Sequence, residues 1–186
     1  MNTTEYAMRI TEELQAVLSG IDAESGELLA TAILGAKKIL VAGAGRSGFA
    51  VKSFAMRLMH MGFDVYVVGE TVTPNLESDD LLLVASGSGE TGSLVVMSQK
   101  AKCLGAKLAT VTVHPDGTVA SLSDVVVRIP APSPKASVVD AFRSIQPMGS
   151  LFEQSLLLYL DALILRLMEL RGDNSDNMFT RHANLE

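Results

Sequence analysis

Five short runs of Val, Leu and Ala alternate along the chain with segments in which apolar residues recur at helical spacing. The runs are continuous rather than alternating, as Leu81-Leu82-Leu83-Val84 shows, and strands of this kind are covered on both faces of a sheet. Strands joined by helical crossovers run parallel to one another. The pattern therefore predicts an α/β fold with a doubly wound, five-stranded parallel sheet flanked by helices.

The boundaries of the elements follow from the same pattern. We expect strands at residues 38–42, 64–68, 81–85, 108–113 and 125–129. We expect helices at residues 5–18, 23–34, 48–61, 92–104 and 119–122, followed by a long helix from about Met148 and a polar tail from Gly172. Gly62 and Gly105 come directly after two of these helices, where glycine commonly ends a helix.

The size and charge of the chain narrow the class of protein. Its 186 residues are enough for one domain and too few for two ordinary ones, so we treat residues 1–186 as a single unit. A formal charge of −6 provides no general attraction for nucleic acid or acidic lipid, and an anionic ligand must be held by local groups. The lone Cys103 cannot form an intramolecular disulfide, and the first residues lack the pattern of a signal peptide. We expect a cytoplasmic protein that binds neither nucleic acid nor membrane.

The long C-terminal helix is apolar around most of its circumference. Residues 151–170 also include polar side chains that make a bilayer centre unfavourable: Glu153, Gln154, Asp161, Arg166 and Glu169. Burial on two sides, against its own sheet and against another subunit, explains the pattern better. This helix predicts a homo-oligomer.

Two glycine-rich loops each follow a predicted strand and lead into a helix. The first glycine loop is Gly43-Ala44-Gly45-Arg46-Ser47-Gly48, and the second is Ser86-Gly87-Ser88-Gly89-Glu90-Thr91. Glycine lets a backbone approach an anion closely, helix N-termini offer unpaired N–H groups, and hydroxyls complete the hydrogen bonds. The loops therefore predict a site for a phosphorylated ligand.

The candidate phosphate ligands are the hydroxyls of Ser47, Ser86, Ser88 and Thr91, the backbone N–H groups around Gly87 and Gly89, and the guanidinium of Arg46. Serine and threonine at these places could instead only cap helices, and Arg46 could only be solvated.

The first glycine loop also matches the dinucleotide fingerprint G-x-G-x-x-G, which leaves a nicotinamide-dependent oxidoreductase as an alternative. Asp64 lies near the distance expected for the ribose-binding acid, but it begins its strand, whereas the fingerprint needs the acid at the strand's end. Glu70, just after that strand, keeps the alternative open. The second glycine loop has no role in a minimal dinucleotide site, but it has one if a single phosphate lies across two adjacent strand ends.

The two loops resemble those of the sugar isomerase (SIS) domain family, which contains phosphosugar isomerases and phosphosugar-binding regulators with a flavodoxin-like parallel sheet. Further blocks resemble one subfamily, 6-phospho-3-hexuloisomerase: residues 53–62, residues 146–154, and the tail with Met178-Phe179 and residues 182–186. The resemblance implies a homotetramer that needs no cofactor and interconverts 3-hexulose 6-phosphate and fructose 6-phosphate. This is a step of formaldehyde assimilation in the ribulose monophosphate pathway.

Glu153 is the candidate for the proton transfer that this reaction needs. Moving a ketone from C3 to C2 removes the C2 proton, passes through a cis-enediol and returns a proton at C3, and one carboxylate can perform both transfers. Glu153 begins a strongly apolar helix and lies in a block specific to the subfamily. It also fits a capping box with Ser150, in which the glutamate accepts a hydrogen bond from the cap residue's backbone N–H. The sequence leaves both interpretations open.

His182 is the second catalytic candidate. It lies in a polar tail where Met178 and Phe179 could anchor the chain to a surface, although an idle, frayed tail is the alternative. The resemblance implies that a histidine of this segment reaches a neighbouring subunit's site. There it could move protons between the two oxygens or help to open the furanose ring of fructose 6-phosphate.

The remaining polar residues have weaker claims to a site. Glu90 would repel phosphate if it pointed inward, so we expect it to face away. His60 and Arg57 lie near the end of a methionine-rich helix, where positive charge is favourable without any site role. Three widely separated histidines and one cysteine give no recognisable metal-ligand spacing, and we expect no metal.

The alternatives to this isomerase within the SIS family are a non-catalytic phosphosugar-binding regulator and an aldose–ketose phosphate isomerase.

Overall fold

A five-stranded sheet, whose strands all run parallel, forms the centre of a computed structural model that describes residues 1–132 and 143–185. The strands are β1 (Ile39–Gly43), β2 (Val65–Val67), β3 (Leu81–Ala85), β4 (Lys107–Thr112) and β5 (Val125–Arg128), in the order β2-β1-β3-β4-β5. Each strand begins and ends within one residue of the predicted run. The expected α/β fold with a parallel sheet is confirmed.

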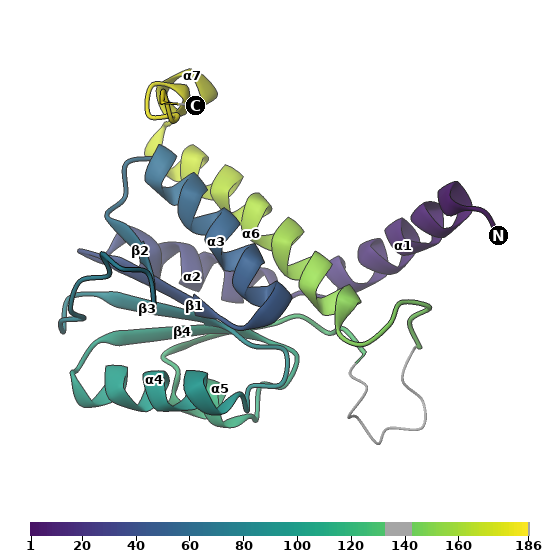
Figure 1. Cartoon of the computed structure of the whole chain (residues 1–186), viewed down its shortest axis with the longest axis horizontal. Coiled ribbons are helices and arrows are strands. Elements are labelled where there is room, and N and C mark those ends of the chain that lie inside the picture. The colour runs from purple at the N-terminus through teal and green to yellow at the C-terminus, as the bar shows by residue number, and fades with distance from the viewer. Residues whose placement is uncertain (133–142, 186) are drawn as a thin grey trace.

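Helices cover both faces of this sheet (Figure 1). α2 (Ala23–Leu34), α3 (Gly45–His60), α6 (Ser150–Arg171) and the end of α1 (Thr3–Leu18) form one layer, and α4 (Gly92–Cys103) and α5 (Thr118–Leu122) form the other. Alternate strand residues face opposite layers: Val41 and Leu83 join the first core, and Leu40 and Leu82 join the second. Because both faces are covered, the strands are apolar along their length, which explains the continuous runs in the sequence.

Two helical segments differ from the prediction. α3 begins at Gly45, earlier than expected, because the first glycine loop is tight and leads directly from β1 into the helix. α7 (Ser175–Phe179) is a short helix in the segment that we expected to be only a polar tail. Asn174 caps it by accepting a hydrogen bond from the backbone N–H of Asn177 (2.9 Å).

α6 buries one apolar side in this chain and exposes another. Leu156, Leu160 and Leu167 are fully buried in the first core, whereas Leu157, Leu158 and Leu165 are exposed on the other side of the helix. Among the described residues, no helix has the length and apolar character needed to cross a membrane. One buried side of α6 is therefore confirmed, and its second apolar side lies on the surface of the chain.

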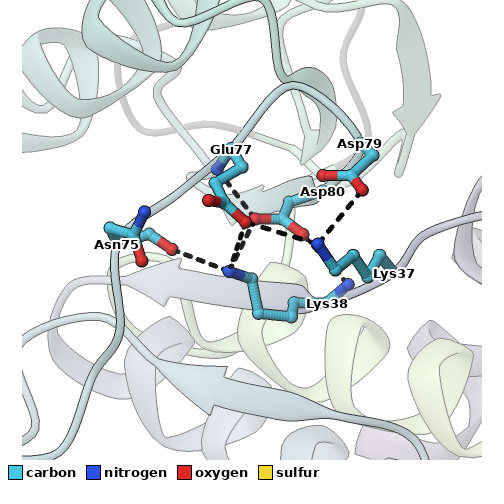
Figure 2. Close-up of polar contacts among 6 residues, drawn as sticks. All are labelled: Lys37, Lys38, Asn75, Glu77, Asp79 and Asp80. Atoms are coloured by element: carbon cyan, nitrogen blue, oxygen red, sulfur yellow. Dashed lines mark hydrogen bonds and ion pairs between the residues drawn. The ribbon is translucent and has the colours of Figure 1, made fainter.

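A charged cluster of Lys37, Lys38, Glu77, Asp79 and Asp80 holds the amino-terminal edge of the sheet (Figure 2). The fully buried Asp80 carboxylate accepts hydrogen bonds from the backbone N–H groups of Lys38 (3.1 Å) and Glu77 (2.7 Å). It also lies 3.3 Å from the Lys38 ammonium. The cluster ties the start of β1 to the loop before β3.

Asp80→Ala is expected to lower the free energy of unfolding by about 3 kcal/mol, because the Lys38 ammonium and two backbone N–H groups lose a buried partner. Asp79→Ala removes a more exposed carboxylate of the same cluster and is expected to cost less than about 1 kcal/mol. Urea denaturation of both variants measures the two values. Equal losses would contradict the central place of Asp80 in the cluster.

Candidate active site

The two glycine loops lie side by side at the carboxyl-terminal edge of the sheet. β1 and β3 are neighbours, and Gly43 at the end of β1 is paired with Ala85 at the end of β3. From β1 the chain continues to β2 on one side, and from β3 it continues to β4 on the other. Open α/β sheets bind ligands where the strand order reverses in this way. The predicted placement of the loops at adjacent strand ends is confirmed.

The first glycine loop brings the backbone of α3 against the end of β1. A Cβ atom on Gly48 would lie 2.8 Å from the Gly43 carbonyl oxygen, and one on Gly43 would lie 3.0 Å from the Gly48 Cα atom. Only glycine permits this approach. No side chain of the described chain caps the N-terminus of α3, which begins after Ala44. Ser47 is already inside the first helical turn and is 9% exposed, so its hydroxyl is not a helix cap.

The second glycine loop gathers three hydroxyl groups in front of α4. The buried Ser86 hydroxyl accepts a hydrogen bond from the backbone N–H of Gly89 (3.2 Å) and lies 3.5 Å from the Thr91 hydroxyl. The Ser88 hydroxyl accepts one from the backbone N–H of Glu90 (3.2 Å). Thr91 precedes α4, yet its side chain makes no capping bond to any described residue. The amino end of α4 therefore offers N–H groups and hydroxyls together, a combination that suits an anion.

Glu90, in the same loop, directs its carboxylate to α5. Its two oxygens accept hydrogen bonds from the backbone N–H (2.6 Å) and the hydroxyl (2.8 Å) of Thr118, the first residue of α5. The backbone bond, helped by the hydroxyl bond, lowers the pKa of Glu90. This negative charge is thus engaged by α5, in agreement with the expectation that Glu90 turns away from a phosphate.

Glu153 lies in the first turn of α6, where its carboxylate meets Arg46 of the first glycine loop. The Arg46 Nε and Glu153 Oε2 atoms are 2.5 Å apart, and the Glu153 side chain is 22% exposed. The adjacent Phe152 is buried and packs on the second glycine loop, with its ring 3.0 Å from the place where a Cβ atom on Gly87 would lie. The start of α6 therefore contacts both loops and adds a carboxylate to their hydroxyl groups.

The capping box that the sequence allows at this place does not form. Gly149, not Ser150, is the residue before α6, and no described side chain makes a capping hydrogen bond there. Ser150 is already helical. Glu153 is paired with Arg46 instead, so its interpretation as a helix cap is not supported.

α7 and the C-terminal tail, which carries His182, lie near the opposite end of α6 (Figure 1). The His182 ring stacks on His60 at the end of α3, with the ring centroids 5.4 Å apart, and on Phe179, at 5.8 Å. The 22 residues of α6 separate its two ends by roughly 30 Å. Within one chain, the structure does not bring His182 and Glu153 together.

The tail that carries His182 lines part of an open cavity of about 520 Å³ between α3 and α6. Arg57, His60, Asp161 and His182 supply polar groups to its wall. Burial lowers the pKa of His60, and its electrostatic interactions with Arg57 and His182 lower it further. Met178 packs against the core and anchors the tail. The sequence missed the contact between His60 and His182, because no spacing pattern relates residues so far apart in the chain.

Within the described residues, one group of carboxylates lies close enough to share a metal ion, and it is remote from the glycine loops. Glu77, Asp79 and Asp80 belong to the charged cluster at the opposite edge of the sheet (Figure 2). Lys37 and Lys38 already pair with their oxygens. Two ammonium groups at these oxygens disfavour a cation, so the group has a structural explanation.

Residues 32–158 match the family model of the SIS domain. The chain belongs to the SIS domain family. The match includes both glycine loops and the first turn of α6, and it confirms the resemblance that these segments predicted.

Relatives with a named activity match 95% or more of the chain. A 3-hexulose-6-phosphate isomerase of Bacillus subtilis is 50% identical over 186 residues, with all of both chains covered. One of Mycobacterium gastri is 42% identical over 179 residues, which cover 95% of this chain and 88% of the relative. A crystal structure from Methanococcus jannaschii, from which a function as 3-hexulose-6-phosphate isomerase was inferred, matches with a TM-score of 0.85 at 33% identity. That match covers 98% of this chain and 99% of the other.

Gly48→Ala is expected to destabilise the protein by about 2 kcal/mol, because the new Cβ atom would overlap the Gly43 carbonyl oxygen in a tightly packed site. Gly92→Ala is the matched control: Gly92 begins α4, and a Cβ atom there would meet nothing within 4 Å. Alanine at this position should leave stability unchanged or raise it by up to about 1 kcal/mol. Thermal and urea unfolding compare the two, and equal stabilities would contradict the close approach of β1 and α3.

Proposed function

We propose that this protein is a 3-hexulose-6-phosphate isomerase, which interconverts 3-hexulose 6-phosphate and fructose 6-phosphate in formaldehyde assimilation by the ribulose monophosphate pathway. The observation that carries the proposal is the ion pair of Arg46 and Glu153, which places a carboxylate beside two hydroxyl-lined loops. Relatives of that name, aligned over 95% or more of this chain, support the choice of substrate. The single cysteine, Cys103, is free and exposed, which fits a reducing cytoplasm.

The phosphate of the sugar binds across the ends of β1 and β3. The N-termini of α3 and α4 carry partial positive charge there, and hydroxyls stand beside them. The side chain of Arg46 is 62% exposed, so it can turn between Glu153 and the phosphate. The groups assigned to the phosphate are Ser47, Ser86, Ser88, Thr91, Arg46 and the backbone N–H of Gly87.

Glu153 carries the proton between the two carbons. It removes the C2 proton, and the electron pair of that bond forms the C2–C3 double bond of a cis-enediol while O3 gains a proton. O2 then loses its proton, C2 becomes the ketone, and Glu153 returns its proton to C3. The substrate is oxidised at C2 and reduced at C3 by equal amounts, so the reaction balances without an external oxidant or reductant. The packed start of α6, where the buried Phe152 lies against Gly87, holds the carboxylate in place for both transfers.

His182 acts in the site of another subunit. Its position at the far end of α6 from Glu153 makes a second copy necessary for any catalytic role. Apolar side chains on the surface of α3 and α6 support a homo-oligomer, with Phe49 71% and Leu165 67% exposed, and the family resemblance implies that it is a tetramer. The first half of α1 also projects from the body of the chain (Figure 1). In the assembly, His182 moves the proton between O2 and O3 or opens the furanose ring of fructose 6-phosphate.

Glu153→Gln is expected to lower kcat by about 10³-fold, because an amide cannot accept the C2 proton. Binding of fructose 6-phosphate, measured as a thermal shift, should persist, since the phosphate ligands are intact. Glu169→Gln, at an exposed position of the same helix, is the control and should keep wild-type turnover. A Glu153→Gln enzyme with wild-type kcat would exclude this residue as the base. A wild-type protein that binds fructose 6-phosphate and converts none would instead support the alternative of a non-catalytic phosphosugar-binding regulator.

Co-expression of Glu153→Gln and His182→Gln chains tests the action of His182 across subunits. Each variant by itself should lose most of its activity, whereas mixed oligomers should regain part of it, because some sites then receive an intact Glu153 from one chain and an intact His182 from another. A coupled isomerase assay on differently tagged, co-purified chains measures the recovery. Wild-type activity of His182→Gln by itself, or no recovery on mixing, would contradict the proposal.

A further inference from the structure

Glu13 is a buried carboxylate that the proposed reaction does not use. It lies on α1, is 7% exposed, and accepts three hydrogen bonds from one short segment of the chain. The donors are the Ser144 hydroxyl (2.6 Å), the Ile145 backbone N–H (2.8 Å) and the Gln146 side-chain amide (3.1 Å). Three donors from consecutive residues make Glu13 the binding partner of this segment.

The hydrogen bonds match an ionised carboxylate. Burial by itself would raise the pKa of Glu13, but the bonds from Ser144, Ile145 and Gln146, with the charge of Arg9, outweigh it and lower the pKa. A charged acceptor makes stronger hydrogen bonds than a neutral one. An amide in its place would present an N–H group to side chains that are themselves donors.

The segment held by Glu13 leads directly into α6. Only Pro147, Met148 and Gly149 separate Gln146 from the first residue of the helix. Met148 has a φ of 56°, which is a left-handed backbone conformation. This conformation is unfavourable for residues other than glycine, and it persists only where the surrounding structure imposes it. Its side chain is 86% exposed, so burial of Met148 does not impose that conformation. Met148 lies instead in a turn, closed by a hydrogen bond from the Ser150 N–H to the Pro147 carbonyl (3.2 Å), that links residues 144–146 to α6.

We propose that Glu13 is a positioning residue for the site. By holding residues 144–146 it sets the entry of the chain into α6, and therefore the placement of Glu153 against the two glycine loops. This inference rests on the proposed function, because it assigns a task to Glu13 only through Glu153. Val17, on the same helix, is buried in the core and holds α1 in place independently of this carboxylate.

Glu13→Gln tests the proposal with little change in size. We expect kcat to fall about tenfold while KM for the sugar phosphate stays within about twofold, because the base is displaced and the phosphate ligands are not. Glu12→Gln is the matched control: Glu12 is an exposed neighbour on α1, and its ion pair with Arg9 is long, at 3.8 Å. Its kcat and KM should equal those of the wild type.

Amide hydrogen exchange gives a readout that does not depend on turnover. The backbone N–H of Glu153 donates to the Gly149 carbonyl (3.0 Å) in the first turn of α6. Peptides that cover residues 149–153 should exchange faster in Glu13→Gln than in Glu12→Gln, while peptides from β1 and β3 should not change. If Glu13→Gln does not fold, Ser144→Ala is the second variant, because it removes the donor of the shortest of the three hydrogen bonds. It should show a smaller loss of kcat and the same faster exchange in residues 149–153.

The outcomes separate this inference from the proposed function. Folded Glu13→Gln with wild-type kcat and unchanged exchange in α6 would overturn the positioning role. A rise in KM that accounts for the whole loss of activity would overturn it as well, because that result assigns Glu13 to binding. If the wild type converts no 3-hexulose 6-phosphate, the proposed function fails, and the exchange comparison still decides whether Glu13 fixes the start of α6.

Discussion

The contact between the first turn of α6 and the two glycine loops is the interaction on which the site depends. β1 and β3 place the loops side by side, and the loops supply hydroxyls and N–H groups. The carboxylate of Glu153 comes from much later in the chain, after β5, on a helix that lies along α3 (Figure 1). Its pairing with Arg46 and the packing of Phe152 on Gly87 fix the two parts together. Without that contact the fold would keep the proposed phosphate site and lose the carboxylate that we propose as the base.

An acidic protein that holds a dianion needs a local excess of positive potential. The chain carries a formal charge of −6, yet the N-termini of α3 and α4 meet at the proposed site without side-chain caps in the part that the structure describes. The two nearby carboxylates are both engaged, Glu90 by Thr118 of α5 and Glu153 by Arg46. The helix N-termini therefore give this edge of the sheet a positive potential, and the paired carboxylates do not cancel it, although the net charge of the chain is negative.

The sequence predicted the parts of the molecule that local patterns determine. Continuous apolar runs such as residues 81–85 identify strands, because burial on both faces of the sheet leaves no polar position. The glycine loops could be predicted because each one lies directly between a strand and a helix. The capping box that the sequence left open at Ser150 does not form, because the helix begins one residue earlier than that motif requires, after Gly149. The stacking of His182 on His60 and the bonds of Glu13 to residues 144–146 had no signal at all. These contacts join residues far apart in the chain and depend on tertiary packing.

A crystal structure of the Glu153→Gln protein with fructose 6-phosphate tests the central claim most directly. The account predicts that the phosphate lies between the two glycine loops, in hydrogen-bond contact with the hydroxyls of Ser47, Ser86 and Thr91. It also predicts that C2 and C3 of the sugar face the side chain at position 153. A phosphate bound elsewhere, for example in the cavity beside His60 of the same chain, or a sugar whose C2 and C3 point away from α6, would contradict it.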